Sequence, residues 1–330
     1  MDHKSTVVPH SIGGFGASIC FALSKALVLR RQIPPPGEDY RGDKVLYQQW
    51  RDMELRRQFD TYFSPEDVAG LDVVDFGCGH GELSFYVATL GAKSVIGIEA
   101  SESEYNGALN NAATYKDLLV KPGFILSNDV TVIDLPDSSV DVLLCFDVLE
   151  HVMAYKQIVR EWHRVLRPGG RVLIWWAPWW NPYGPHLQFL IPIPWCHVFF
   201  SMPTIFETCA RIYDLPEYKP CLWDLDDQGR KKPNSWRGMQ DLFLINRLTM
   251  HRFEAICGEV GLSIDVRNVR GFGSAQTLIR GWKSWIGKAT ELFLYIPFLR
   301  EFLTLNVTYD ISKPTVHGSR DSEEWKAAKD

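Results

Sequence analysis

The stretch at residues 71–81 constrains the fold of this chain more than any other part of the sequence. It starts as an apolar run at 71–76 and ends with glycines at three alternate positions, Gly77, Gly79 and Gly81. A helical pattern follows at once, over residues 82–90. A strand that passes through a glycine turn into a helix lets the backbone approach a nucleotide-like ligand closely. The chain is therefore expected to contain an open α/β sheet with a ligand at this turn.

The residues around the glycines argue against two common classes of ligand for such a turn, dinucleotides and the phosphates bound by P-loops. A dinucleotide fingerprint would place Gly or Ala at position 82, where this chain has Glu82. A phosphate-binding P-loop would continue with Lys and Ser or Thr, and these are also absent. Asp75 stands two residues before the first glycine, and an acid at this place suits a ligand with an ammonium group better than a pyrophosphate.

The motif D-x-G-x-G-x-G, which starts at Asp75, resembles the first motif of the class I S-adenosylmethionine (SAM)-dependent methyltransferases. Other stretches typical of that family follow in order. They are an acid that ends the predicted strand 94–99, an Asn-Asp-Val sequence after the predicted strand 123–126, LPDSSVDVLLC at 135–145 and RVLRPGG at 164–170. The resemblance covers residues 71–176. It implies an α/β, Rossmann-like methyltransferase sheet of seven strands, mainly parallel with the last strand antiparallel, with helices on both faces and an inserted cap.

The resemblance also implies SAM as the cofactor and assigns roles to individual residues. Glu99 is expected to accept hydrogen bonds from the two ribose hydroxyls, because two carboxylate oxygens match a cis-diol. It lies 18 residues past Gly81, close to the spacing of about 20 that this fold requires. Asp129, or alternatively Asn128, is expected to accept from the adenine amino group. The full expected set is Asp75, Gly77, Gly79, Gly81, Glu99, Ala100, Asn128, Asp129, Val130 and Phe146.

Five regions are expected along the chain. Residues 1–70 form an N-terminal helical lid and linker, 71–176 the SAM-binding core and 177–248 an aromatic-rich cap. Residues 249–318 complete the sheet and include a helical insert, and 319–330 form a charged tail. The other expected elements are strands at 71–76, 142–146, 171–176, 262–269 and 303–311, and helices at 103–115 and from 249 to 258 or 261.

The cap is marked by its composition. No Asp, Glu, Lys or Arg occurs between Val172 and Phe206, and six prolines in this span forbid a single long helix. Its many aromatic residues predict either plain packing of the cap or an apolar substrate pocket, and membrane contact through a Trp-rich surface is a third interpretation.

The N-terminal region contains two expected helices. Residues 11–31 are apolar with Lys25 among them, and predict an amphipathic helix that packs on the protein or an interfacial membrane anchor. The segment is too short for a confident transmembrane helix. Residues 43–62 predict a lid helix, in which Trp50 or Arg57 either reaches the cofactor or is an ordinary surface or core residue.

Candidate catalytic residues follow from the chemistry of SAM, whose methyl group is already activated. The enzyme has to align the acceptor and exclude water, and needs a base only for an acceptor whose proton has a high pKa. His186 in the cap and His151 after the fourth strand are the candidate bases. His151 is alternatively a packing residue, since the sequence Leu-Glu-His is common in this family whatever the substrate. No metal site is expected, and the alternative is a divalent ion held by Asp147, Glu150, His151 and His186.

The expected function is O-methylation of an apolar or partly apolar small molecule, such as a natural product or a glycosylated or lipid-linked acceptor. Many N-methyltransferases of this fold carry N/D-P-P-Y/F after the fourth strand, where this chain reads Asp-Val-Leu-Glu at 147–150. One alternative is a metal-dependent RNA 2′-O-methyltransferase, but the net charge of −5 gives no overall attraction to nucleic acid. Another is a non-catalytic SAM-binding partner subunit, against which the complete cofactor motif argues.

The cysteines indicate the compartment. The chain has 7 cysteines, scattered and without a C-x-x-C pair, which favours reduced thiols over disulfides or zinc ligands. We expect a cytoplasmic protein with peripheral membrane contact as an option. The sequence predicts no oligomeric state.

Overall fold

The computed structural model describes residues 14–31, 43–226, 228–239, 241–242, 245–271 and 293–315. The chain divides into two compact units. The first combines Met1–Trp50 with Trp179–Ile245, and the second combines Arg51–Pro178 with Asn246–Asp330. The boundary between the N-terminal parts of the two units falls inside a continuous helix, α2 (Lys44–Tyr62).

The second unit contains a seven-stranded sheet with the strand order β3-β2-β1-β4-β5-β7-β6. Its strands are β1 (Asp72–Phe76), β2 (Ser94–Glu99), β3 (Gly123–Leu126), β4 (Val140–Phe146), β5 (Leu166–Trp176), β6 (Ser263–Gly271) and β7 (Thr304–Ser312). The first five run parallel, and β7 lies antiparallel between β5 and β6. The predicted fold, a mainly parallel sheet with the last strand antiparallel, is confirmed.

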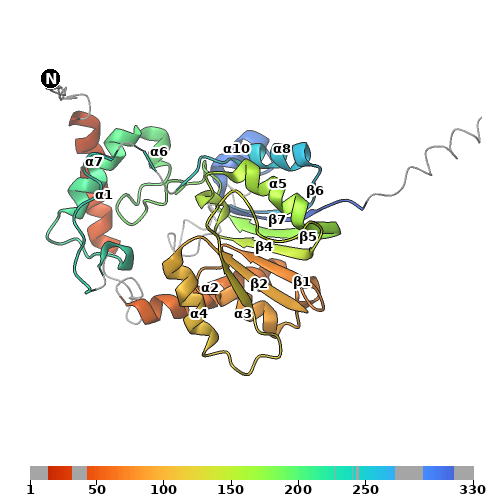
Figure 1. Cartoon of the computed structure of the whole chain (residues 1–330). Helices are drawn as coiled ribbons and strands as arrows, with labels where there is room; N and C mark the ends of the chain where they lie inside the picture. Colours follow the sequence, from red (N-terminus) through yellow and green to blue (C-terminus); the bar gives the residue numbers. More distant parts are fainter. Residues whose placement is uncertain are drawn as a thin grey trace, which may run out of the picture. The chain divides into compact units, whose positions relative to one another are not determined.

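Helices cover both faces of this sheet, as predicted (Figure 1). α2, α3 (Glu82–Thr89) and α4 (Glu102–Ala112) lie on one face, and α5 (Tyr155–Val165) and α8 (Met250–Val260) lie on the other. Short helical segments occur at η1 (Pro65–Asp67), η2 (Leu149–His151) and α10 (Pro297–Leu303). α8 shows why its ends were predictable: the Thr249 side chain accepts a hydrogen bond from Arg252 N at its start, and Gly261 ends it with a φ of 84°.

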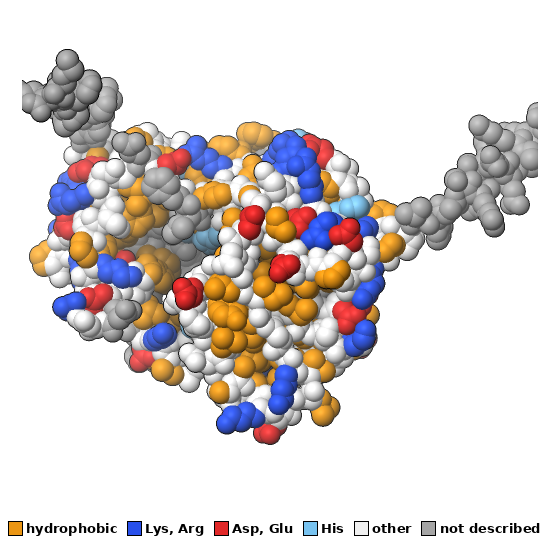
Figure 2. Space-filling model, in the orientation of Figure 1, with side chains coloured by type: hydrophobic (Ala, Val, Ile, Leu, Met, Phe, Trp, Pro, Cys, Tyr) orange, Lys and Arg blue, Asp and Glu red, His pale blue; other side chains and the backbone are white. Residues whose placement is uncertain are grey.

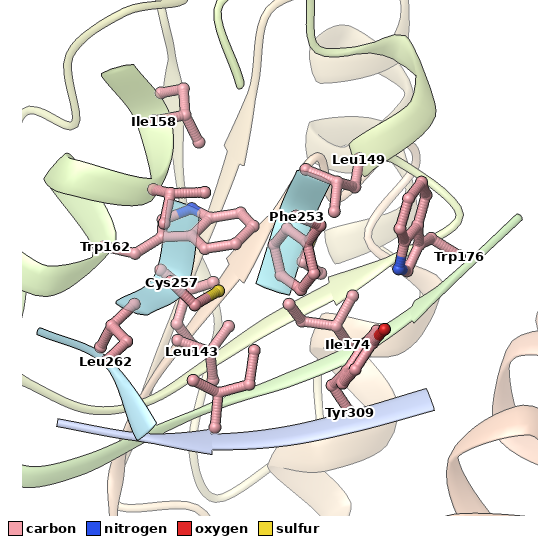
Figure 3. Packing of buried hydrophobic residues seen from close by; sticks show 14 of the residues in the cluster. Leu143, Leu149, Ile158, Trp162, Ile174, Trp176, Phe253, Cys257, Leu262 and Tyr309 are labelled. Carbon is pink, nitrogen blue, oxygen red and sulfur yellow. The ribbon is translucent and has the colours of Figure 1, made fainter. Parts of the chain in front are cut away.

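The core between the sheet and the α5/α8 face is apolar and fully buried (Figure 3). Strand residues alternate between faces, so Leu143 and Ile174 point to this core while Leu144 and Leu173 point to the opposite one. The largest side chains of the α5/α8 core are Trp162, Trp176, Phe253 and Tyr309, each with no exposed area.

β5 differs from its prediction at the start. It begins at Leu166 and not at Arg171, because Leu166 already pairs with Val140 before a bulge separates this pair from the regular register at Val142. The helix before this strand, α5, ends at Val165, so the Arg-Pro-Gly-Gly sequence that follows it belongs to an irregular first part of β5. The predicted insert helix around Trp282 and the charged tail 319–330 lie outside the described residues.

The first unit has its own small core. α1 (Gly14–Arg31) packs on α7 (Met202–Tyr213), with α6 (Cys196–Phe199) and η3 (Leu222–Asp224) nearby in the sequence. Cys20 and Val28 of α1 are buried in the same apolar cluster as Ile205 and Phe206 of α7. The predicted helix near the N-terminus is thus confirmed. Within the described ranges no helix has the length and apolar character needed to cross a membrane. All seven cysteines are free and buried.

Candidate active site

The glycine turn after β1 has a backbone that glycine alone adopts readily. Gly77, Gly79 and Gly81 have positive φ angles of 75°, 55° and 82°. A Cβ atom on Gly77 would lie 2.5 Å from Val148, and one on Gly81 would lie 2.9 Å from the ring of Phe124. Glycine is therefore required at both of these positions by conformation and by space.

Asp75 is the buried acid in front of this turn. Its side chain is 3% exposed and accepts a 2.6 Å hydrogen bond from Ser84 Oγ. Burial, and to a smaller extent the charges of Glu82 and Glu99, raise the pKa of Asp75 to about 7. A cationic group close to this carboxyl would lower its pKa and be stabilised by it. SAM carries two such groups, a sulfonium and an ammonium, and Asp75 fits the methionine end of this cofactor.

Glu99 ends β2 and is held against the glycine turn. Its Oε2 accepts a hydrogen bond from Gly79 N at 2.9 Å. Its Oε1 accepts from Ala100 N and Ser101 N, both at 2.8 Å. Each carboxylate oxygen has about two acceptor positions, so Oε2 keeps one for a hydroxyl group. The predicted ribose acid is therefore preorganised beside the turn with acceptor capacity left.

The loop after β3 lies next to Glu99, because Ser127 N donates to the Glu99 carbonyl oxygen at 2.7 Å. Asp129 Oδ1 accepts from Thr131 Oγ1 at 2.6 Å and from Thr131 N at 2.8 Å. These bonds lower the pKa of Asp129, so its carboxyl stays ionised. Oδ2 makes no hydrogen bond to a described residue and is available to a donor such as the adenine amino group.

The remaining residues expected at the adenine lie on the surface. Asn128 and Ala100 are exposed, and Val130 is 54% exposed. Val132, which the sequence did not predict as a cofactor residue, is 49% exposed. Figure 2 shows that hydrophobic side chains gather on the presented face of the unit that carries the sheet. An exposed apolar side chain beside a hydrogen-bond acceptor suits the face and edge of an adenine ring.

A small cavity of about 30 Å³ connects four of the predicted cofactor residues. Asp75, Gly77, Gly79 and Phe146 line it together with Arg51, Leu55, Cys78, Glu82 and Leu83. SAM is much larger than this cavity, and we expect its adenosine part to lie over the half-buried Glu99 and the exposed loop after β3. The last five of these residues were not predicted from the sequence, and two of them, Arg51 and Leu55, come from α2.

Two residues of α2, Arg51 and Leu55, line the small cavity, and the candidates named from the sequence, Trp50 and Arg57, are not in its lining. Arg51 is the charged one of the two. Its Nη1 lies 2.6 Å from Asp147 Oδ2, in an ion pair that joins α2 to the residue after β4. Asp147 has a positive φ of 59°, uncommon for a residue with a side chain. The signal in the sequence was helical spacing, since Arg51 and the buried Leu55 are four residues apart and share a face.

The segment that contains the glycine turn is similar to a known domain. Residues 74–174 match the methyltransferase domain family. A probable S-adenosylmethionine-dependent methyltransferase of Mycolicibacterium smegmatis is 37% identical over 106 residues, which are 32% of this chain and 38% of that protein. This chain carries a class I SAM-dependent methyltransferase domain.

Two further relatives of the methyltransferase domain differ in how far they match. The 27-O-demethylrifamycin SV methyltransferase of Amycolatopsis mediterranei is 35% identical over 106 residues, again 32% of this chain and 38% of that protein. The matched segment therefore covers 38% of the M. smegmatis protein and 38% of the A. mediterranei protein. A solved SAM-dependent methyltransferase of Methanosarcina mazei is 17% identical, with a TM-score of 0.43 over 74% of this chain and 93% of that one.

The cofactor of the methyltransferase domain is SAM, and the residues present fit it. Asp75 is an acid buried at the turn, Glu99 keeps an acceptor position, and the turn has no room for side chains at Gly77 or Gly81. The individual roles of the ten predicted cofactor residues remain predictions.

The loop after β4 of the methyltransferase domain carries a buried acid. Glu150 is 2% exposed, and neither of its carboxyl oxygens has a hydrogen-bond partner among the described residues. Burial, assisted by the charge of Asp147, raises its pKa well above the usual range. Asn246 fixes the same loop, since its Nδ2 donates to Leu149 O at 2.7 Å and Val152 O at 2.9 Å.

The two predicted catalytic histidines belong to different units. His151 is exposed at the end of η2 in the second unit. His186 is half-buried in the first unit, with a positive φ of 56°. Their roles as bases therefore remain predictions, as does the alternative that the same histidines hold a metal.

Proposed function

We propose that this chain is a SAM-dependent methyltransferase that transfers the methyl group to an oxygen of an apolar or partly apolar small molecule. The main observation behind the proposal is a hydrogen bond between two predicted cofactor motifs, the glycine turn and the acid at the end of β2. Gly79 N of the glycine turn donates to Glu99 Oε2 at the end of β2, within a segment that matches the methyltransferase family. This one hydrogen bond brings the expected methionine end and the expected ribose end of SAM together.

The residues of the cavity provide what methyl transfer needs. SAM supplies an activated methyl group when it is bound. Asp75 stabilises the cationic end of the cofactor, and the buried side chains of Leu55 and Phe146 exclude water from the place of reaction. Alignment of the acceptor with the methyl group can contribute up to about 7–11 kcal/mol in the best intramolecular cases.

Two observations favour oxygen as the acceptor atom. The sequence at 147–150 lacks the N/D-P-P-Y/F pattern, and the buried Glu150 stands at the place of its aromatic residue. One relative, 35% identical over 106 residues, has a name that describes an O-methyltransferase. An oxygen acceptor with a high pKa needs a base, and His186 and His151 are the candidates.

The test is transfer of label from SAM that carries a labelled methyl group. Purified full-length protein is incubated with extract from its source organism, with and without EDTA, and label is followed into organic, aqueous, nucleic-acid and protein fractions. The Glu99→Ala variant serves as the negative control. Label in the small-molecule fraction that is insensitive to EDTA supports the proposal. EDTA-sensitive label in nucleic acid contradicts it in favour of RNA methylation, and SAM binding without transfer in any fraction favours a non-catalytic subunit.

We also propose that α1 binds to an anionic membrane surface, which would bring the protein to lipid-linked acceptors. The side of α1 that packs on α7 contains Ala17, Cys20 and Val28, which are buried. The outward side is apolar too, with Ile19, Leu23 and Leu27 at 42%, 51% and 40% exposed. A surface helix normally has a polar outer face. The 18 residues of α1 contain Lys25, Arg30 and Arg31 but no acid, which complements a negative surface.

Cosedimentation with lipid vesicles tests this contact. We expect binding to vesicles of phosphatidylcholine with phosphatidylglycerol, and loss of most of it in Leu23→Ser with Leu27→Ser. The matched control is Leu109→Ser with Leu119→Ser, which removes two exposed leucines from the second unit and should leave binding unchanged. Equal binding by both double variants would contradict the proposal.

A further inference from the structure

A larger cavity, of about 320 Å³, lies within the sheet-bearing unit beside α2. Its volume is within the usual range for small-molecule sites, about 300–1,000 Å³. It adjoins the cofactor cavity, because residues of the two cavities are neighbours. Gln58 of the larger cavity is three residues from Leu55 on α2, and Trp175 is the cross-strand partner of Phe146. A molecule in the larger cavity therefore lies next to the end of β4.

Gln58 gives this cavity an unsatisfied hydrogen-bond acceptor. The side chain is 6% exposed, and its Nε2 donates to Glu54 Oε1 at 3.2 Å. This bond to a carboxylate fixes which end of the amide is nitrogen. The other end, Oε1, is buried and has no donor among the described residues. A buried acceptor left in this state costs about 1–3 kcal/mol, which a ligand hydroxyl would recover.

Arg57 gives the cavity a positive charge with donors to spare. Its Nε and Nη2 bind the carboxylate of Glu54 at 2.6–3.0 Å. A guanidinium has five N–H donors, and Nη1 makes no hydrogen bond to a described residue. Arg270 of β6 adds a second guanidinium to the lining. Arginine recognises planar or tetrahedral oxyanions through paired N–H bonds, so this wall suits a carboxylate, sulfonate or phosphate.

The remaining wall is apolar and aromatic, with Trp175, Tyr62 and Val269 among the lining residues. The adjacent strand β7 adds two more unsatisfied oxygens on the same face of the sheet. Thr308 pairs with Trp175 and is 1% exposed, and Asn306 pairs with Arg270 and is 6% exposed. Neither Thr308 Oγ1 nor Asn306 Oδ1 has a partner in the described part of the chain. Buried polar atoms without partners are rare in folded proteins, and each requires an explanation such as a bound water, ion or ligand.

We propose that this cavity holds the methyl acceptor and selects an apolar molecule that carries one anionic group and one hydroxyl. The anionic group binds Arg57, the hydroxyl donates to Gln58 Oε1, and the apolar body packs against Trp175. This inference rests on the proposed function, because it takes the occupant to be the acceptor of the methyl group.

The experiment uses two fluorescent probes of the same apolar body. 8-Anilinonaphthalene-1-sulfonate carries an anion and N-phenyl-1-naphthylamine does not. We expect Arg57→Gln to weaken binding of the sulfonate probe by at least about tenfold, the loss of one charge-assisted contact, and to leave the neutral probe within about twofold. Arg57→Lys keeps the charge and should retain most of the affinity.

Arg56→Gln is the matched control. Arg56 is the next residue of the same helix and forms an equivalent ion pair with Asp52 at 2.9 Å, but it does not line this cavity. We expect it to leave sulfonate binding unchanged. Equal losses in Arg56→Gln and Arg57→Gln, or no loss in either, would overturn the proposal. A melting curve of each variant shows that the comparison is made on folded protein.

A failure of this inference differs from a failure of the proposed function. SAM affinity is measured by calorimetry on the same variants, and Arg57→Gln should leave it within about twofold. If wild-type protein bound no SAM, the proposed function would fail even where the probe results held. If label was transferred from SAM but Arg57→Gln did not change the affinity for the sulfonate probe, the proposed methyltransferase function would be supported. The acceptor would then bind outside this cavity.

Discussion

The two faces of the sheet are made by the same strands and differ sharply in polarity. On the α5/α8 face the buried strand residues are almost all apolar, as Leu143, Ile174 and Trp176 show. On the α2/α3 face the neighbouring positions include Asp75, Thr308 and Asn306, all at least nine-tenths buried. Burial of apolar area favours folding, and burial of unpaired polar atoms opposes it. Both faces therefore stabilise the domain through buried apolar residues, and the α2/α3 face additionally retains buried polar groups on its strands.

The largest expected loss of stability follows from a large-to-small substitution in the apolar core between the sheet and α5/α8. Phe253 has no exposed area, and its ring lies 5.8 Å from that of Trp176 and 5.3 Å from that of Tyr309. Phe253→Ala should lower the free energy of unfolding by about 3–5 kcal/mol, measured by urea denaturation. SAM affinity of the folded variant should stay unchanged. Phe298→Ala, at a 71% exposed ring, is the control and should cost less than about 0.5 kcal/mol.

The next effect concerns the edge of the sheet that binds the cofactor. Glu99→Ala removes the acceptor expected for the ribose, and should weaken SAM binding by at least tenfold, about 1.4 kcal/mol. Calorimetry measures the change. Glu102→Ala, in the exposed first turn of α4, should have no effect on affinity. An unchanged affinity in Glu99→Ala would overturn the ribose assignment.

A smaller and pH-dependent effect is expected at Asp75, whose pKa burial raises to about 7. A cationic ligand binds the ionised form, so SAM affinity should rise by about tenfold between pH 6 and pH 8 and then level off. Asp75→Asn should remove this dependence in calorimetry at a series of pH values. The stability of the free protein should show the opposite sign. The folded pKa lies above the unfolded value near 4, so the folded state binds more protons and stability falls as pH rises from about 4 to 7.

The smallest expected change in stability is at Thr308, a buried polar residue on the α2/α3 face. Thr308→Val replaces a buried hydroxyl without a described partner by a methyl group of similar size. We expect the free energy of unfolding to stay the same or rise by up to about 1 kcal/mol, because an unsatisfied group is removed and valine suits a strand. Thr308→Ser, which keeps the hydroxyl, should be less stable than wild type. A loss of more than about 1 kcal/mol in Thr308→Val would show that the hydroxyl is bonded in the folded state.

Much of the fold could be predicted because its signals are local. The apolar runs at 72–76 and 94–99 and the glycines between them are contiguous in sequence, and the observed strands β1 and β2 match within one residue. β5 was predicted five residues short, because its early pairing of Leu166 with Val140 depends on a bulge in a distant strand. Nothing in the local sequence Arg-Pro-Gly-Gly suggests a strand.

The candidate site was predicted less completely for the same reason. Asp75 and Glu99 are marked by their motifs, whereas the ion pair of Arg51 with Asp147 joins residues 96 positions apart. Gln58 has ordinary sequence surroundings, and the only local signal of Arg51 is its helical spacing with the buried Leu55. The packing of α2 against the sheet is what brings both residues to the cavities. Long-range contacts of this kind have no signature in a single sequence.

The hydrogen bonds of Asn246 fix the place where the inserted segment ends. The inserted segment leaves the sheet just after β5 and returns at Asn246, which is tied to the carbonyl groups of Leu149 and Val152. The point of return is thereby anchored independently of what the insertion contains. In evolution, the inserted segment can therefore be replaced by one of another length and another preference for acceptors. The loop after β4 would inherit the same conformation each time.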